Sequence, residues 1–267
     1  MAAWTRRSIL KAVGAAAAGA VPPVSGMLSA ASNEASPLPP PLKAEVFRER
    51  QESLRRSARA RGLDALFVTP STNLAWAANL SIGRSERLTA LLLLTEGPAI
   101  LVTPSFEESN HKRTAVVDEV RTWNEDQDPL ALTAKVLAGK RAVGVEGSTS
   151  YATAVGLASA ASAKLEEATP VFDPLRMIKS EEEQGFIRDA ARRTTLAISA
   201  THKRLRAGMT ESEVARLLEE EFARLNVRGG GLVQFGPSSA FPHGGPEQRR
   251  LARGDAVLID AGCKVRG

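Results

Sequence analysis

The sequence predicts an α/β domain built on a mixed sheet, followed by a second, smaller unit that begins near Pro174. Short apolar runs alternate with helical patterns over residues 65–146, which is typical of a sheet layered with helices. The turn at 95–98 (TEGP) lies between two apolar runs, as in a hairpin, so two neighbouring strands run antiparallel and the sheet is mixed. After Pro174 the pattern changes to two long helical stretches followed by short strands.

The N-terminus has the three regions of an export signal. Arg6 and Arg7 precede a modestly apolar run of alanine and glycine, and small residues follow it. The segment 5–11 (TRRSILK) resembles the twin-arginine consensus, which directs the export of folded proteins. The run at 12–24 contains two prolines and is shorter than the roughly 20 residues of a membrane span. We expect residues 1–31 to be a twin-arginine signal peptide of a periplasmic or extracellular protein, without stable membrane insertion; an uncleaved interfacial anchor is the alternative.

The first domain is expected over residues 44–173. Residues 32–43 before it are rich in proline and lack apolar periodicity, which is typical of an extended linker. The first element of the domain is an Arg/Glu-rich helix that ends at Gly62, because glycine commonly follows a helix C-terminus. The expected strands are the apolar runs at 65–69, 89–95, 99–103 and 142–146.

The second unit is expected over residues 174–267. Capping boxes open at Ser180 and at Thr210, so a helix starts at each of them. We expect the first helix to end at Arg206, shortly before a glycine. The second helix carries apolar residues at helical spacing, and Glu221 is the one polar residue in that stripe.

The last part of the chain is expected to form two short strands, at 232–235 and 256–260. The glycines at 229–231 lack the lysine and hydroxyl residue of a phosphate loop, so we expect a flexible turn there. Asp260 follows four apolar residues, which predicts a carboxylate at the end of a buried strand. A buried carboxylate requires a cation or several hydrogen-bond donors, so Asp260 is a candidate ligand; a turn residue at the strand end is the alternative.

The three histidines and the one cysteine are not equally good candidates for a functional site. His243 lies in a Pro-His-Gly-Gly-Pro loop and changes its charge near neutral pH, which suits proton transfer or stabilisation of an oxyanion; an exposed loop histidine without a role is the alternative. His111 and His202 lie in helical stretches with arginine and lysine, and we expect both at the surface. Cys263 is the only cysteine, which excludes an intramolecular disulfide, and we expect it to be a small buried hydrophobe.

The charge of the chain argues against a nucleic-acid partner. The formal net charge of the 267 residues is +5, but three of the cations, Arg6, Arg7 and Lys11, lie in the first 31 residues, where there is no acid. The remaining cations alternate with carboxylates, as over residues 48–62, which is typical of a solvated helix face. We therefore expect no nucleic-acid binding.

Three short motifs carry a resemblance to a known family. They are LRMIKSEEE at 175–183, Pro242-His243, and GDAVLIDAG at 254–262, with His243 and Asp260 separated by 17 positions. In this order they resemble the creatinase, prolidase and aminopeptidase P family of metallopeptidases. The resemblance implies a creatinase/prolidase-type N-terminal domain and the first part of an α+β catalytic domain with the pita-bread fold.

The resemblance also implies an activity and a site. Asp260 would be a metal ligand, and His243 would contact the substrate near the scissile bond. The family binds two divalent cations that share a water or hydroxide, and an oxygen-rich ligand set suits manganese, with zinc or cobalt as alternatives. The implied function is hydrolysis of the peptide bond before proline in short peptides, by a protein whose N-terminal domain often forms a homodimer.

The sequence departs from the family after Asp260. The family site needs a second aspartate, a histidine and two glutamates further along, and residues 261–267 contain no carboxylate or histidine side chain. We therefore expect the 267 residues to be an inactive, incomplete part of a peptidase that binds no metal pair. Two alternatives stay open: a creatinase-like hydrolase that works without metal, and a non-catalytic binding or dimerisation module on the same fold.

Overall fold

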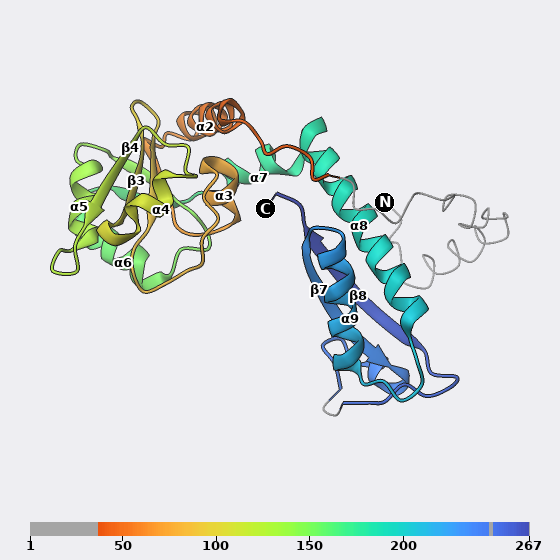
Figure 1. The fold of residues 1–267 in the computed structure, drawn as a ribbon. Coiled ribbons are helices and arrows are strands. Elements are labelled where there is room, and N and C mark those ends of the chain that lie inside the picture. Colours follow the sequence, from red (N-terminus) through yellow and green to blue (C-terminus); the bar gives the residue numbers. More distant parts are fainter. Residues whose placement is uncertain (1–36, 246–247, 267) are drawn as a thin grey trace, which may run out of the picture. The chain divides into compact units, whose positions relative to one another are not determined.

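The computed structural model describes residues 37–245 and 248–266 (Figure 1). The expected signal peptide at 1–31 and the first part of the expected linker at 32–43 lie outside the described residues. Residues 37–43 contain neither helix nor strand, and the first helix within the described ranges begins at Ala44. Within the described ranges, none of the helices combines the length and apolar character that a membrane crossing needs.

The first folded part is a six-stranded unit, residues 44–177, and its sheet is mixed as predicted. The strand order is β4-β3-β2-β1-β5-β6. β1 pairs antiparallel with β2, and β2 pairs antiparallel with β3 through the expected turn at 95–98, whereas the other neighbours are parallel. The strands are β1 (Ala65–Val68), β2 (Ala90–Leu94), β3 (Ala99–Pro104), β4 (Glu119–Trp123), β5 (Ala142–Val145) and β6 (Lys164–Glu167).

Helices cover both faces of this sheet, which explains why its central strands are apolar at every position. Leu66 and Val68 of β1 belong to one buried cluster, whereas Ala65 and Phe67 belong to another, so successive side chains enter opposite cores. The helices are α2 (Ala44–Arg59), α3 (Thr72–Ala78), α4 (Glu108–Lys112), α5 (Pro129–Val136), α6 (Tyr151–Ala160) and α7 (Thr169–Met177), with a 3-10 turn η2 (Ser105–Glu107).

The second part is a two-stranded unit, residues 181–266. Its elements are α8 (Glu181–Arg204), α9 (Glu211–Arg224), β7 (Arg228–Phe235), a 3-10 turn η3 (Gly236–Ala240) and β8 (Val257–Lys264). Both predicted capping boxes are present, at Ser180 and at Thr210. α8 ends at Arg204, two residues before the expected end. Pro174, near which the second unit was expected to begin, lies inside α7, and the boundary between the two domains stays a prediction.

The glycines at 229–231 do not form the expected flexible turn. All three belong to β7 and pair with β8. A Cβ atom on Gly229 would lie 2.6 Å from the Phe222 ring, and one on Gly231 would lie 2.3 Å from the carbonyl oxygen of Asp260. At positions 229 and 231, glycine is therefore favoured because α9 and β8 approach the backbone closely, and the chain continues as a strand.

His111 is buried, contrary to the expected surface position. Only 7% of the residue is exposed, and its Nδ1 lies 2.8 Å from the Thr103 hydroxyl, also buried. The helix α4 places this one side chain towards the sheet, although its neighbours Asn110 and Lys112 are exposed. Burial lowers the pKa of His111, against the opposing effect of Glu107. His202 is exposed, as predicted.

Candidate functional site

Asp260 lies in the middle of β8, on the open face of the strand pair. Exposed residues alternate along β8 with partly buried ones, and Asp260 is exposed. The expectation of a carboxylate at the end of a buried strand is therefore wrong. The physical reason is that α8 and α9 cover the β7–β8 pair on one face only, so that only every second side chain enters the core. The partly buried residues of β8 are Val257, Ile259, Ala261 and Cys263, and the exposed ones are Leu258, Asp260, Gly262 and Lys264.

The length of β8 was missed in the sequence, although a signal for it is present. Ala261, Cys263 and Val265 continue the period of two beyond Asp260, and all three belong to the core between the strands and α8. Cys263 is partly buried, and its thiol donates to the carbonyl oxygen of Ala190 on α8 at 3.4 Å. The thiol thus lies on the opposite face of β8 from Asp260, and it takes no part in the candidate site.

The loop that carries His243 is fixed by a buried glutamine of β7. The Nε2 atom of Gln234 donates to the carbonyl oxygens of Ser238 at 2.7 Å and of Phe241 at 3.0 Å. Gln234 is 2% exposed, so these bonds lie in the interior, where an amide needs partners. His243 itself is exposed. The sequence reasoning did not identify Gln234 as the residue that holds this loop.

The loop of His243 and the side chain of Asp260 meet the same face of the strand pair. Leu232 of β7 is the direct partner of Asp260 of β8, and directly paired residues project to the same side of a sheet. A Cβ atom on Gly244, the residue after His243, would lie 3.8 Å from Leu232. The two candidate residues are therefore on neighbouring segments at the open face.

The described residues do not hold a metal pair by themselves. Over residues 37–245 and 248–266 there is no group of three or more histidine, cysteine, aspartate or glutamate side chains that could bind a metal ion. Asp260 supplies at most two carboxylate oxygens, whereas divalent cations are held by several protein ligands. The arrangement provides one exposed carboxylate and one exposed imidazole, and any metal site would need further ligands.

Comparisons with known proteins agree with this architecture. The chain is 33% identical over 232 residues to the probable dipeptidase PepE of Mycobacterium tuberculosis, covering 82% of this chain and 60% of that protein. The crystal structure of dipeptidase PepE from Mycobacterium ulcerans matches with a TM-score of 0.73 at 30% identity, covering 84% of this chain and 62% of that one. A prolidase from Thermococcus sibiricus, at 22% identity and a TM-score of 0.75, shares the fold. The chain thus shares the fold of the matched part of these peptidases.

Two family matches divide the chain between them. Residues 50–178 match the Creatinase/Prolidase N-terminal domain, and residues 185–267 match metallopeptidase family M24. The chain therefore contains a creatinase/prolidase-type N-terminal domain followed by part of an M24 metallopeptidase domain. It spans about 60% of the length of the dipeptidases named above.

Proposed function

We propose that this chain supplies a metal ligand and the substrate-contacting histidine of a metal-dependent peptidase that hydrolyses the bond before proline in short peptides. The observation that carries the proposal is the exposure of Asp260 on the open face of β8, next to the segment that bears His243. The names of the relatives support a dipeptidase. In this proposal the remaining metal ligands come from residues that are not among the 267 of this sequence.

The roles of the two residues follow from their chemistry. The Asp260 carboxylate is a hard anionic ligand suited to a divalent cation, for which we propose manganese rather than zinc or cobalt. Bound divalent metals supply a nucleophilic hydroxide and polarise the peptide carbonyl. The imidazole of His243 can donate a hydrogen bond or a proton to the substrate without binding the metal. We also propose that the active form is a homodimer.

A chimera tests these roles. The full chain is joined to the part of Mycobacterium tuberculosis PepE that lies beyond the matched region, and it is purified with manganese. We expect cleavage of an Xaa-Pro dipeptide that stops on chelation. Asp260→Asn should lower the bound metal, because a neutral amide replaces an anionic ligand. His243→Ala should keep the metal and lower kcat by about 100-fold, the lower range for a lost acid–base group.

The matched control is Asp255→Asn. Asp255 precedes β8 and accepts a hydrogen bond from the amide of Ala252 at 2.9 Å, so it has a local turn role, and its replacement should leave the metal content unchanged. Loss of metal in His243→Ala but not in Asp260→Asn would reverse the two assignments. Cleavage that persists after chelation would favour a hydrolase without metal, and a folded chimera without any cleavage would favour a binding module.

We further propose that residues 1–31 direct export through the twin-arginine route to a periplasmic or extracellular location. The support is the Arg6-Arg7 pair ahead of a weakly apolar run. A reporter that is active only after folded export, fused to residues 1–40, should lose export when both arginines become lysine. Unchanged export of that double variant would refute the proposal.

A further inference from the structure

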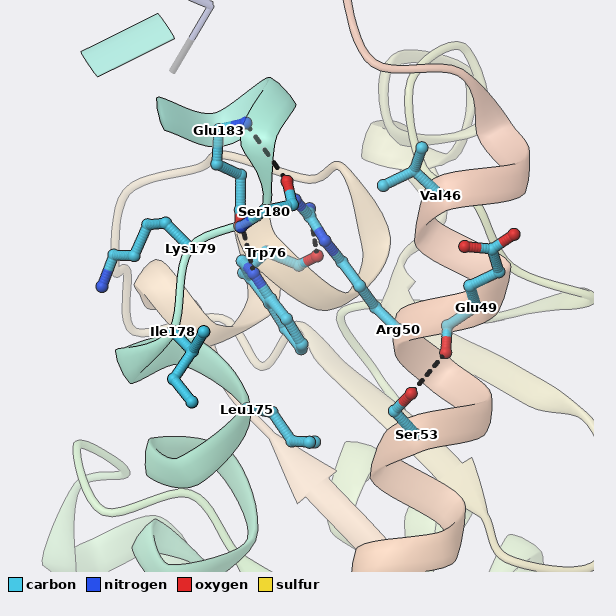
Figure 2. A pocket seen from close by; sticks show the side chains of 10 residues that line it. All are labelled: Val46, Glu49, Arg50, Ser53, Trp76, Leu175, Ile178, Lys179, Ser180 and Glu183. Atoms are coloured by element: carbon cyan, nitrogen blue, oxygen red, sulfur yellow. Dashed lines mark hydrogen bonds and ion pairs between the residues drawn. The ribbon is translucent and has the colours of Figure 1, made fainter. Parts of the chain in front are cut away.

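Glu183, in the first turn of α8, binds groups from three segments of the chain (Figure 2). Its Oε2 atom accepts a hydrogen bond from the amide of Ser180 at 2.8 Å, which closes the capping box of α8. Its Oε1 atom accepts from Arg50 of α2 at 2.8 Å and from the indole Nε1 of Trp76 of α3 at 3.0 Å. One carboxylate therefore caps a helix and also joins that helix to two others.

Arg50 is fixed on several sides, so it is a rigid partner for this carboxylate. Its guanidinium donates to the carbonyl oxygen of Trp76 at 3.0 Å, and it stacks 4.8 Å from the Trp76 ring and 5.1 Å from the Phe47 ring. The Arg50 side chain is 10% exposed, and that of Glu183 is 22% exposed. An ion pair with this little exposure is screened less by water and salt than a surface pair.

The link between α7 and α8, residues 178–180, has little packing of its own. Ile178 is 82% exposed, and Met177 before it is 75% exposed. A hollow of about 310 Å³ lies beside the link, and its walls include the aliphatic side chains of Val46, Leu175 and Ile178. The contacts of Glu183 therefore hold the start of α8 at a place where apolar burial is small.

We propose that Glu183 acts as a latch, by which we mean that its one carboxylate both caps the first turn of α8 and attaches that turn to α2 and α3. Because the same carboxylate makes both sets of bonds, release from Arg50 and Trp76 loosens the link at 178–180. α8 packs on β8, the strand of Asp260, so the latch joins the six-stranded unit to the helix that supports the candidate site. This inference does not depend on the proposed peptidase activity.

The test compares Glu183→Gln with Glu181→Gln in the full chain. Glutamine can still accept the bonds of a capping box, so Glu183→Gln removes the charge that binds Arg50 while it preserves the helix start. Glu181 lies in the same turn and is exposed, so its replacement makes the same change in charge and is the matched control. The measurement is the rate at which trypsin, under native conditions, releases the fragment that ends at Lys179.

We expect this rate to rise about fivefold in Glu183→Gln, the effect of losing roughly 1 kcal/mol of a charge-assisted bond, and to stay unchanged in Glu181→Gln. The indole N–H resonance of Trp76, assigned with Trp76→Phe, should shift in the first variant only. In Arg50→Met the cleavage should rise similarly, and adding Glu183→Gln to it should have little further effect.

Two results would overturn the latch. Equal cleavage rates in Glu183→Gln and Glu181→Gln would show that the bonds to Arg50 and Trp76 do not hold the link. Fully multiplicative effects of Glu183→Gln and Arg50→Met would show that the two residues act separately. If Glu183→Gln does not fold, Trp76→Phe decides instead: it removes one donor and leaves the capping box, and unchanged cleavage in it would refute the latch.

Discussion

Glu221 is a buried carboxylate of α9 that binds two arginines. It is 6% exposed, and its carboxylate binds Arg204 at 2.6 Å and Arg224 at 2.7 Å. The hydrogen bond that Arg204 donates to the Glu221 carboxylate raises the pKa of Arg204. The pattern of the sequence identified Glu221 as a polar residue in an apolar stripe, but Arg204 lies on another helix, and a single helix period does not show a partner on a second helix.

Replacing Glu221 by glutamine should lower the free energy of unfolding by about 1–2 kcal/mol, since the two arginines lose a charged acceptor while the shape is kept. The control is Glu220→Gln. Glu220 is exposed and binds Arg204 at 3.1 Å, so the loss of its charge should lower the free energy of unfolding by less than about 0.5 kcal/mol. Urea unfolding followed by circular dichroism measures both. Equal losses in the two variants would contradict the importance of burial.

For some single residues, the sequence does not predict the surroundings of the side chain. Asp260 and His243 were found from their neighbours along the chain, but the exposure of Asp260 depends on which faces α8 and α9 cover, and that is a property of the assembled unit. His111 was assigned to the surface from its charged neighbours, whereas helix α4 turns it towards Thr103. The spacing of apolar residues along an element and the residues that cap a helix are local features, so the sequence predicts them. The direction of one side chain in a short helix is not predictable in this way.

The elements followed the sequence closely wherever a local signal was strong. Both capping boxes and the hairpin turn were predicted, because each depends on residues within four positions of one another. The strand β7 was predicted four residues too short. Its first half contains three glycines, and glycine normally disfavours a strand. The close approach of Phe222 explains Gly229, and that of β8 explains Gly231.

Gly231→Ala tests this explanation of the glycines in β7. The new Cβ would meet the backbone oxygen of Asp260 at 2.3 Å, which forces the two strands apart, and we expect a loss of about 2 kcal/mol in stability, typical of overpacking. Gly230→Ala is the control in the same strand, because its nearest neighbour would be an atom of Glu219 at 3.6 Å, an ordinary contact. Thermal unfolding measures both. A Gly231→Ala variant as stable as Gly230→Ala would contradict the close approach.

At the scale of the whole molecule, several carboxyl groups link stability to pH. Backbone amides of Arg141 and Ala142 donate to Asp64 and lower its pKa, and the amide of Thr210 does the same for Glu213. Burial tends to raise the pKa of Glu183, but the bonds from Ser180, Trp76 and Arg50 outweigh it, so its pKa is lowered too.

The sign of the effect follows from these shifts. A carboxyl group with a lowered pKa in the folded state binds fewer protons there than in the unfolded state, so its stabilisation is complete above the unfolded pKa of about 4 and is lost as the pH falls through the folded value. We therefore expect these carboxyl groups to leave the midpoint of thermal unfolding unchanged from about pH 7 to 5 and to lower it below about pH 4. His111, whose pKa is also lowered, should add a separate decrease that begins as the pH falls below about 6.5, the unfolded value for histidine. Asp64→Asn should reduce the fall below about pH 4; an unchanged slope there would contradict the assignment.

The position of the thiol of Cys263 offers a way to watch the molecule open. Its sulfur lies against Ala190 and Thr194 of α8, and the sequence has no second cysteine. A thiol reagent therefore has one target, and it reacts fastest when α8 separates from β8. The labelling rate, measured against that of a small free thiol at the same pH, reports how often this local opening occurs. The labelling of Cys263 in the native chain thus measures how often α8, the helix that packs on the strand of Asp260, detaches from that strand.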